Sequence, residues 1–280
     1  MVDLSVLTSV ESLRDRLYSD NGDSTVSFVA TMGALHHGHI ELVKEASELA
    51  DTVVLSIFVN PTQFNNKEDL INYPRTLHKD IELLEGFENV VVFAPPISEI
   101  YPDGYNTFEL ELGILERVME GEFRPGHFKG VVKVVKRLFD IIEPDYALFG
   151  QKDFQQLAVI EYMTKAFKMP VKIVGCETVR EPSGLASSSR NYRLSEKELI
   201  DAEIIFQTME YVKTLVDKHS VQEAIDLANK YFEQGELRLE YLEIVHPETL
   251  EQLDEWVSGA RLCMAAFCGE VRLIDNCAVC

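Results

Sequence analysis

The sequence predicts an α/β fold: a doubly wound parallel sheet followed by a second, smaller α+β domain. Short apolar runs alternate with segments of helical periodicity through the first two-thirds of the 280 residues. The run 53–59 is almost continuously apolar, which is typical of a strand buried on both faces of a parallel sheet. After about residue 180, two helical stretches precede three strands, so we expect domains at 1–180 and 181–280.

Each predicted element follows from its local pattern. Apolar runs of strand length occupy 26–30, 53–59, 90–94, 145–149 and 171–179. Segments of helical periodicity occupy 39–50, 75–86, 128–142 and 153–168. The turn-rich segment 181–184 (EPSG) separates the two domains. In the second domain we expect helices at 195–218 and 221–234, and strands at 238–246, 261–268 and 271–276.

Composition limits the partners. The formal net charge of −21 argues against nucleic acid as a partner, because binding a polyanion requires a basic face. The sequence has no uninterrupted apolar stretch long enough to span a bilayer, and its first residues lack the basic start and apolar core of a secretory signal. We therefore expect a cytoplasmic protein that does not bind membranes.

The five cysteines are an odd number, and without an export signal we expect reduced thiols. Cys277 and Cys280 have C-x-x-C spacing, and together with Cys263 and Cys268 they leave a four-thiolate zinc site open. The position of Cys263 and Cys268 in an apolar run, which indicates a buried strand, argues against such a site.

Segment 31–39 (TMGALHHGH) carries the strongest functional signal. It connects an apolar strand to a helical pattern through a turn with two glycines, an arrangement that favours anion binding at the helix start. The first N–H groups of a helix lack intrahelical partners, and His36 and His39 can add hydrogen bonds to phosphate oxygens. The spacing His36-x-Gly38-His39 is similar to the HxGH motif of nucleotidyltransferases, which act on the α-phosphorus of ATP. A solvated turn with incidental histidines is the alternative.

Polar residues also follow the other predicted strands. Ligands of open parallel sheets bind beyond the carboxyl ends of the strands, so these residues are expected to lie along one edge. The residues concerned are Met32, His36 and His39 after the first strand, Asn60 to Phe64 after the second, 150–156 after the fourth, and Arg180 with 187–191 after the fifth.

Lys152 and the loop 188–190 favour a polyphosphate ligand. A lysine at the head of a helix is poorly placed for the helix dipole, unless an anion compensates for its charge. Ser188, Ser189 and Arg190 offer hydroxyl and guanidinium donors suited to phosphate oxygens. The alternatives are an exposed Lys152 or one paired with Asp153, and an ordinary serine-rich loop.

Gln63 and Gln156 indicate a carboxylate acceptor. A carboxylate that attacks phosphorus should not be held by a strong ion pair, and neutral amides can orient it with less stabilisation of the ground state. Capping of a helix or loop is the alternative role for both glutamines.

Taken together, these motifs resemble the pantothenate synthetase (pantoate–β-alanine ligase) family over nearly the whole chain. The matching segments are 31–36 (TMGALH) with 38–39 (GH), 56–61 (SIFVNP) with 63–64 (QF), 73–76 (YPRT), 126–128 (GHF) with 130–131 (GV), 152–156 (KDFQQ), 178–181 (TVRE) and 188–191 (SSRN).

The resemblance implies an ATP-dependent ligase that condenses (R)-pantoate with β-alanine through an enzyme-bound pantoyl adenylate, releasing pyrophosphate and AMP. It also implies Mg²⁺ on the triphosphate, a Rossmann-like N-terminal domain, a smaller C-terminal lid and a homodimer. Asp80 and Asp153 are acidic candidates near the metal, although phosphates and water can supply most of its ligands.

The resemblance also assigns residues. His39, His36 and Lys152 are expected to be catalytic, and Gln63, Gln156 and Asn60 to bind the substrate. The expected ATP-binding residues are Met32, Gly33, Ala34, Leu35, His36, His39, Gly150, Gln151, Lys152, Asp153, Val179, Ser187, Ser188, Ser189 and Arg190. Two positions depart from the family pattern, because Gln151 stands where glutamate is usual and Ser187 where methionine is frequent. Both departures leave the expected catalytic groups in place.

Three alternatives stay open. A cytidylyltransferase or a mononucleotide adenylyltransferase would share the HxGH loop, but the loop 60–64 lacks the basic residues expected for a phosphate-bearing acceptor. A metal-dependent hydrolase could use His36, His37 and His39, although the helical H-E-x-x-H motif and a nearby acidic pair are missing. A pure binding module is the third.

Overall fold

The computed structural model describes residues 5–18, 24–64, 67–105 and 108–280. Their contacts form two compact units. The first comprises residues up to Leu112, Arg124–Gln151 and Gln156–Glu177, and the second comprises Gly113–Phe123, Lys152–Gln155 and Thr178–Cys280. The domain boundary after residue 180 stays a prediction, and this grouping begins the last segment of the second unit at Thr178.

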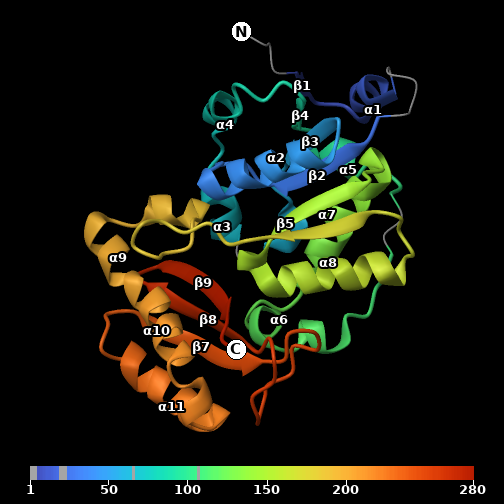
Figure 1. The fold of residues 1–280 in the computed structure, drawn as a ribbon. Coiled ribbons are helices and arrows are strands. Elements are labelled where there is room, and N and C mark those ends of the chain that lie inside the picture. The colour runs from blue at the N-terminus through green and yellow to red at the C-terminus, as the bar shows by residue number, and fades with distance from the viewer. Residues whose placement is uncertain (1–4, 19–23, 65–66, 106–107) are drawn as a thin grey trace. The chain divides into compact units, whose positions relative to one another are not determined.

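The first unit contains the predicted parallel sheet. Its six strands are ordered β1-β4-β3-β2-β5-β6 and every neighbouring pair is parallel (Figure 1). The strands are β1 Val6–Leu7, β2 Val26–Thr31, β3 Thr52–Ile57, β4 Val90–Phe93, β5 Tyr146–Gly150 and β6 Lys172–Cys176. The doubly wound α/β fold is confirmed, and only the two-residue edge strand β1 was not predicted.

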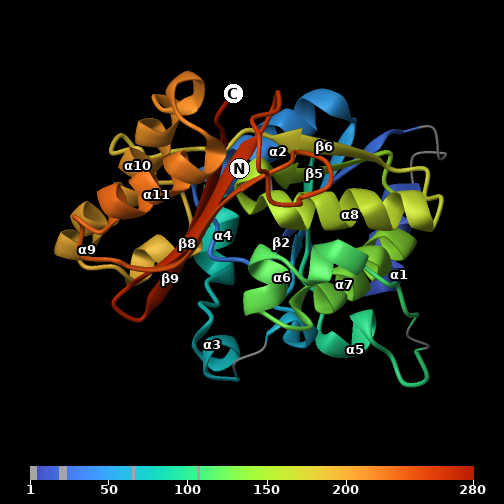
Figure 2. The ribbon, with the colours of Figure 1, turned by 90° about the horizontal axis from the view of Figure 1, so that it is seen from below.

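Helices cover both faces of this sheet because successive strand residues point to opposite sides. Val29 packs with Val43 and Ala46 of helix α2 (His37–Leu49). Its neighbour Phe28 packs edge-to-face against Phe139 of helix α7 (His127–Ile142), at 6.0 Å between ring centroids. Accordingly, α2 and α7 lie on opposite sides of the sheet in Figure 2.

The remaining helices of this unit have nine residues or fewer, except α8, which has 13. They are α1 Val10–Tyr18, α3 Lys67–Asn72, α4 Leu77–Leu83, α5 Ile97–Ile100 and α8 Phe154–Ala166, with the 3₁₀ turns η1 Pro61–Gln63 and η3 Gln151–Asp153. The first two residues of α8 group with the second unit. The sequence patterns did not reveal α1, α3 or α5, because such short segments show too little periodicity.

Strand order reverses at β2, which has β3 on one side and β5 on the other. The loops that follow β2 and β5 therefore leave the sheet from neighbouring carboxyl ends, where ligands of open α/β sheets bind. This topology supports the predicted use of the residues that follow Thr31 and Gly150.

The second unit packs helices on an antiparallel sheet of three strands in the order β7-β8-β9. The strands are β7 Arg238–Val245, β8 Arg261–Cys268 and β9 Val271–Ala278, and all three were predicted. The helices are α6 Met119–Phe123, α9 Glu196–Asp201, α10 Glu203–Lys213 and α11 Val221–Phe232, with the 3₁₀ segments η2 Gly113–Glu116, η4 Ser189–Arg193 and η5 Val216–Lys218.

Two elements differ from their predicted extents. The stretch 195–218 is not one helix, because the N–H of Ala202 bonds to both Glu198 and Ile200 and tightens the chain there. The predicted strand 171–179 ends at Cys176, and Arg180 instead forms an isolated antiparallel bridge with Ala186.

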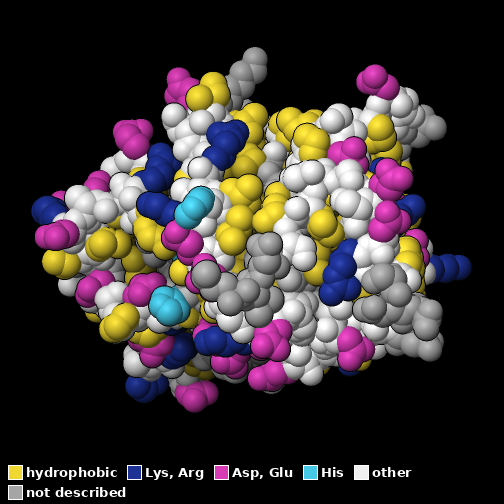
Figure 3. Space-filling view, turned by 90° about the horizontal axis from the view of Figure 1, so that it is seen from above, with side chains coloured by type: hydrophobic (Ala, Val, Ile, Leu, Met, Phe, Trp, Pro, Cys, Tyr) yellow, Lys and Arg dark blue, Asp and Glu magenta, His cyan; other side chains and the backbone are white. Residues whose placement is uncertain are grey.

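Within the residues that the structure describes, no helix combines the length and apolar character needed to cross a membrane. Acidic side chains lie scattered among basic ones over the face shown in Figure 3, in keeping with the net charge of −21.

Candidate active site

The loop between β2 and α2 has a backbone shape that requires glycine. Gly33 has φ 80° and Ala34 has φ 51°, both in the left-handed region. A Cβ atom on Gly33 would lie 3.1 Å from Asp80 Oδ2 and 3.1 Å from Ile57 Cγ2. The two consecutive left-handed residues turn the chain sharply between the buried strand and the histidines.

Asp80 of helix α4 stabilises this turn by accepting hydrogen bonds from its backbone. Its side chain is buried, with 1% of the residue exposed. Oδ2 accepts a hydrogen bond from Ala34 N at 3.1 Å, and Oδ1 accepts from Leu35 N at 2.8 Å and from Thr76 Oγ1 at 3.1 Å. The carboxylate is thus occupied by the protein, so its position favours a structural role over metal ligation.

His36 and His39 together cap the N-terminus of α2. His36 Nδ1 accepts a hydrogen bond from Gly38 N at 3.1 Å, and His39 Nδ1 accepts from His36 N at 3.3 Å. Their ring centroids are 4.0 Å apart. A neutral imidazole whose Nδ1 accepts a hydrogen bond carries its hydrogen on Nε2, so this network assigns both rings as Nε2–H donors. His37, which received no predicted role, is exposed.

Asn60 organises the loop after β3. With 1% of the residue exposed, it donates from Nδ2 to Gln63 Oε1 at 3.0 Å and to Gly130 O at 3.1 Å. Its Oδ1 accepts from Thr62 Oγ1 at 2.9 Å and from Tyr101 Oη at 3.0 Å. Burial raises the pKa of Tyr101 to about 12, which keeps that phenol a donor. Asn60 therefore holds Gln63 in place, and a direct contact between Asn60 and substrate stays a prediction.

Gln63 joins two of the predicted groups. Its Nε2 lies 3.1 Å from Met32 Sδ, so the amide is next to the turn that carries the histidines. His127 Nδ1 lies 2.9 Å from Gln63 O. Gly130 allows α7 to lie close to the backbone of Thr62 and Gln63, because a Cβ atom at position 130 would come within 2.4 Å of Thr62 O. His127 and Gly130 belong to the motif segments 126–128 and 130–131, but only the structure reveals that they support the Gln63 loop.

The residues after β5 belong to both units. Gly150 ends β5, and Gln151 donates from Nε2 to Gly175 O at 3.1 Å, all within the first unit. Gln156 is half-buried in the first turn of α8 and also belongs to the first unit. Lys152 and Asp153 belong to the second unit.

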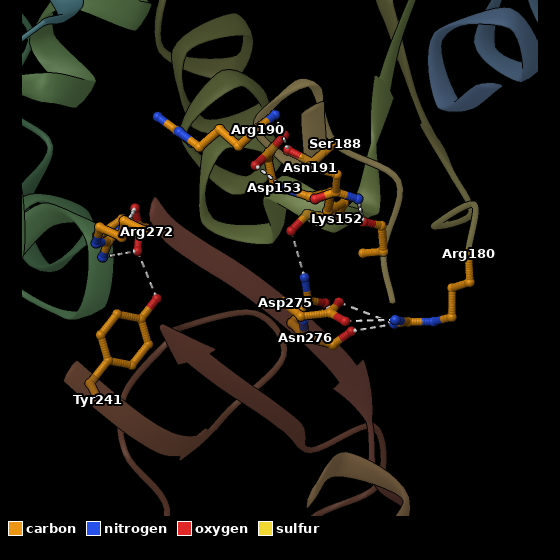
Figure 4. A network of polar contacts seen from close by, with 12 residues as sticks. Lys152, Asp153, Arg180, Ser188, Arg190, Asn191, Tyr241, Arg272, Asp275 and Asn276 are labelled. Carbon is orange, nitrogen blue, oxygen red and sulfur yellow. Dashed lines mark hydrogen bonds and ion pairs between the residues drawn. The ribbon is translucent and has the colours of Figure 1, made fainter. Parts of the chain in front are cut away.

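The second unit brings Lys152 together with the predicted serine–arginine loop. Lys152, Ser188 and Arg190 line one pocket, and these three residues are labelled in the close view of Figure 4. The polar residues of its lining are Lys152, Ser188, Arg190, Asn191, Arg272 and Asp275. The alternative of a Lys152–Asp153 pair has only a long contact, 3.5 Å from Nζ to Oδ1. A pocket that gathers lysine and arginine side chains suits an anionic ligand.

The chain turns back on itself between Val179 and Ser187, and this turn positions the other predicted residues of this unit. Ser187 N donates to Val179 O at 2.9 Å, which brings these two residues together. Ser187 is buried, and its hydroxyl donates to Glu181 Oε1 at 2.6 Å. Ser188 Oγ accepts from Arg190 N at 3.3 Å and caps the 3₁₀ turn η4, to which Ser189 also belongs.

Arg272 lines the same pocket but was not predicted. It donates from Nη1 and Nη2 to the two carboxylate oxygens of Glu120, at 2.8 and 2.7 Å, and from Nε to Glu240 at 2.7 Å. Tyr241 donates to Glu120 at 2.9 Å, and burial, together with the Glu120 charge, raises its pKa well above the usual range. An arginine between the apolar residues Val271 and Leu273 of a predicted strand was the signal that could have revealed it.

Among the residues the structure describes, no group of three His, Cys, Asp or Glu side chains could hold a metal ion. This removes the support for the zinc site and for the hydrolase that would use His36, His37 and His39. The cysteines are free thiols, and burial raises the pKa of Cys263 and, to about 11, that of Cys277.

Comparison with known proteins gives a consistent result. A sequence model of the family described as pantoate-beta-alanine ligase matches residues 5–278. The pantothenate synthetase of Phocaeicola vulgatus is 48% identical over 281 residues, covering 98% of this chain and 97% of that protein. The pantothenate synthetase of Bacteroides thetaiotaomicron is 48% identical over 254 residues, covering 90% of each chain.

Solved structures agree with the sequence relatives. The crystal structure of pantothenate synthetase from Thermus thermophilus superposes with a TM-score of 0.93 at 42% identity, covering 99% of both chains. The pantoate-beta-alanine ligase of Francisella tularensis, complexed with beta-gamma ATP and beta-alanine, has a TM-score of 0.82 at 34% identity. That match covers 99% of this chain and 98% of the other.

Proposed function

The chain belongs to the pantoate–β-alanine ligase family, and from this premise we propose how its residues perform the reaction. The enzyme condenses (R)-pantoate with β-alanine in two steps. The pantoate carboxylate attacks the α-phosphorus of ATP, giving pantoyl adenylate and releasing pyrophosphate. The amine of β-alanine then attacks the acyl carbon, and AMP leaves to give pantothenate.

The contact between Gln63 and Met32 is the observation that carries this proposal. It brings a neutral amide next to the turn that ends in His36 and His39, at the point where strand order reverses. In this scheme Gln63 orients pantoate and β-alanine, Gln156 is a second pantoate ligand, and Asn60 contributes by fixing the Gln63 amide. A neutral amide holds the carboxylate without the ion pair that would reduce its nucleophilicity.

His36, His39 and Lys152 are the proposed catalytic residues. Negative charge builds on the α-phosphate oxygens during attack, and the two Nε2–H groups and the Lys152 ammonium would stabilise it. A well-placed donor of this kind contributes on the order of 3 kcal/mol to the transition state. Because Nδ1 of each ring is already an acceptor, we assign both histidines as neutral donors.

The proposed ATP contacts come from both units. In the first unit they are Met32, Gly33, Ala34, Leu35, His36, His39, Gly150 and Gln151; in the second they are Lys152, Asp153, Val179, Ser187, Ser188, Ser189 and Arg190. We also propose, as the family resemblance implies, that the second unit acts as a lid that excludes water from the adenylate.

We propose that Mg²⁺ enters with ATP as part of the substrate. The described residues offer no converging set of metal ligands, and the carboxylate of Asp80 is occupied by backbone N–H groups. Phosphate oxygens and water suit Mg²⁺, with the Asp153 carboxylate as an available protein ligand. A homodimer and a cytoplasmic location stay predictions.

Mass spectrometry provides the test. Enzyme mixed with ATP and pantoate, without β-alanine, should form a species with the mass of pantoyl adenylate and release pyrophosphate. Adding β-alanine should convert this species to pantothenate and AMP. Formation of pantothenate without any detectable adenylate or pantoate-dependent pyrophosphate exchange would exclude the two-step mechanism.

A further inference from the structure

The main chain of Lys152 is tied to the last strand of the chain. Asn276 of β9 donates from Nδ2 to the carbonyl oxygen of Lys152 at 2.8 Å, as Figure 4 shows. Asn276 is buried, with 4% of the residue exposed. The 124 residues that separate the partners make this a tertiary contact within the second unit.

The orientation of the Asn276 amide is fixed by a second partner. Arg261 donates from Nε to Asn276 Oδ1 at 3.0 Å, and its guanidinium stacks over the Phe154 ring at 4.6 Å. An arginine can only donate and a carbonyl can only accept, so a flipped amide would lose both bonds. Nδ2 of Asn276 must therefore point at Lys152.

Asp275, the residue before Asn276, is also held by hydrogen bonds. Asp275 accepts hydrogen bonds from Arg180 Nη1 at 2.6 Å and Nη2 at 3.1 Å, a bidentate pair whose carboxylate is almost fully buried. Asn276 N also donates to Asp275 Oδ1 at 2.8 Å. The Arg180–Asp275 and Arg261–Asn276 pairs thus hold this part of β9 in place.

We propose that Asn276 is a positioning residue for Lys152, acting through the Lys152 carbonyl; this rests on the proposed catalytic role of Lys152. Lys152 lies in the three-residue turn η3, and its long side chain can rotate about each bond of its flexible four-carbon stem. Fixing the carbonyl sets the point from which that side chain reaches into the pocket shared with Ser188 and Arg190. β9 would therefore control how well the ammonium meets the triphosphate.

Asn276→Asp removes the donor of this contact. The carboxylate keeps an acceptor for Arg261, so the fold should persist, but it places an oxygen against the Lys152 carbonyl where a donor stood. We expect pantoate-dependent ATP–pyrophosphate exchange to fall on the order of tenfold to a hundredfold, the cost of a misplaced catalytic group. Exchange at the parental rate would overturn the proposal.

Asn229→Asp is the matched control. Asn229 of α11 donates from Nδ2 to the carbonyl of Ile225 at 3.0 Å, the same kind of bond in the same unit, and it does not line the pocket. This variant should exchange pyrophosphate at the parental rate. If thermal unfolding shows that Asn276→Asp fails to fold, Asn276→Ser, whose hydroxyl is too short to reach Lys152, takes its place with the same expected loss.

A double-mutant cycle separates positioning from a purely structural effect. ATP affinity, measured by calorimetry, should fall in Asn276→Asp and in Lys152→Ala, and the double variant should bind ATP no worse than Lys152→Ala alone. An equal further loss in the Lys152→Ala background would overturn the proposal. If Lys152→Ala itself exchanges pyrophosphate normally, the failure lies in the proposed role of Lys152.

Discussion

The carboxylate of Asp80 accepts a hydrogen bond from the backbone N–H of Leu35 at 2.8 Å. The same carboxylate accepts from Ala34, so a buried charge holds the left-handed turn that precedes the histidines. Hydrogen bonds from backbone N–H groups offset the cost of burying this charge. The position of His36 therefore depends on a helix that begins about 40 residues further along the chain.

Asp80→Asn tests this dependence. The amide would direct its NH₂ group at a backbone N–H, leaving a buried donor unsatisfied at a cost of about 1–3 kcal/mol. We expect a lower unfolding temperature and slower pyrophosphate exchange in the folded variant. Glu82→Gln on the same helix is exposed and should change neither quantity. Unchanged stability in Asp80→Asn would show that the turn keeps its shape without the charge.

Lys152→Ala should abolish pantoate-dependent pyrophosphate exchange while the protein stays folded. Lys152 lines the pocket of the second unit, and its ammonium is the proposed stabiliser of the developing charge. Circular dichroism and exchange of labelled pyrophosphate measure the two outcomes. Lys165→Ala, in the last turn of α8, is a matched control at an exposed lysine. Near-normal exchange would remove Lys152 from the mechanism.

Gln63→Ala should raise the KM for pantoate roughly tenfold, since one hydrogen bond to a charged group contributes about 1.5 kcal/mol. The KM for ATP should change far less, because the amide faces the acid rather than the nucleotide in this scheme. Steady-state kinetics with each substrate varied in turn measure both values. Equal increases for the two substrates would mean that Gln63 does not face pantoate.

His39→Ala should greatly reduce the turnover of adenylate formation. His37→Ala is the control, because His37 is exposed and lies two residues away on the same helix. The ¹⁵N shifts of His36 and His39 should show the hydrogen on Nε2 and an unprotonated Nδ1 in both rings. A hydrogen on Nδ1 of either ring would contradict the histidine cap, and unchanged turnover in His39→Ala would make that residue a spectator.

The capping box of α11 predicts a pH dependence of stability. The Ser220 backbone N–H and then its hydroxyl lower the pKa of Glu223 below its usual 4.5. A lowered folded pKa stabilises the native state above the unfolded value, and this contribution is lost as pH falls through the folded pKa. Urea unfolding should show Glu223→Gln less stable than the parent at pH 7, and the difference should shrink as pH falls through the folded pKa of Glu223. Glu248→Gln, in an exposed turn, should show no such convergence.

The parallel sheet could be predicted because most of its strands are visible in the sequence as short apolar runs. β3 carries the apolar run Val53, Val54 and Leu55 followed by Ile57, and a two-sided burial pattern follows from that run. The predicted groups after β2 and β3 also meet, through Gln63 and Met32. The order of strands and loops was enough to predict that these groups lie along one edge of the sheet, but it did not predict this particular contact.

The supporting contacts could not be predicted, because they depend on which surfaces meet in three dimensions. A glycine at position 130 gives no hint that its missing side chain makes room for Thr62. Asp80 was an acidic candidate near a metal, whereas its two oxygens bind backbone N–H groups. Asn276 lies in a correctly predicted strand, but the sequence alone does not reveal that its side chain bonds to Lys152.

The histidine cap of α2 constrains how this protein can be altered. Serine or aspartate could also cap this helix, but neither carries the imidazole Nε2–H group that the proposed mechanism uses. If His36 has the proposed catalytic role, replacing it with a standard capping residue to raise heat resistance would reduce turnover.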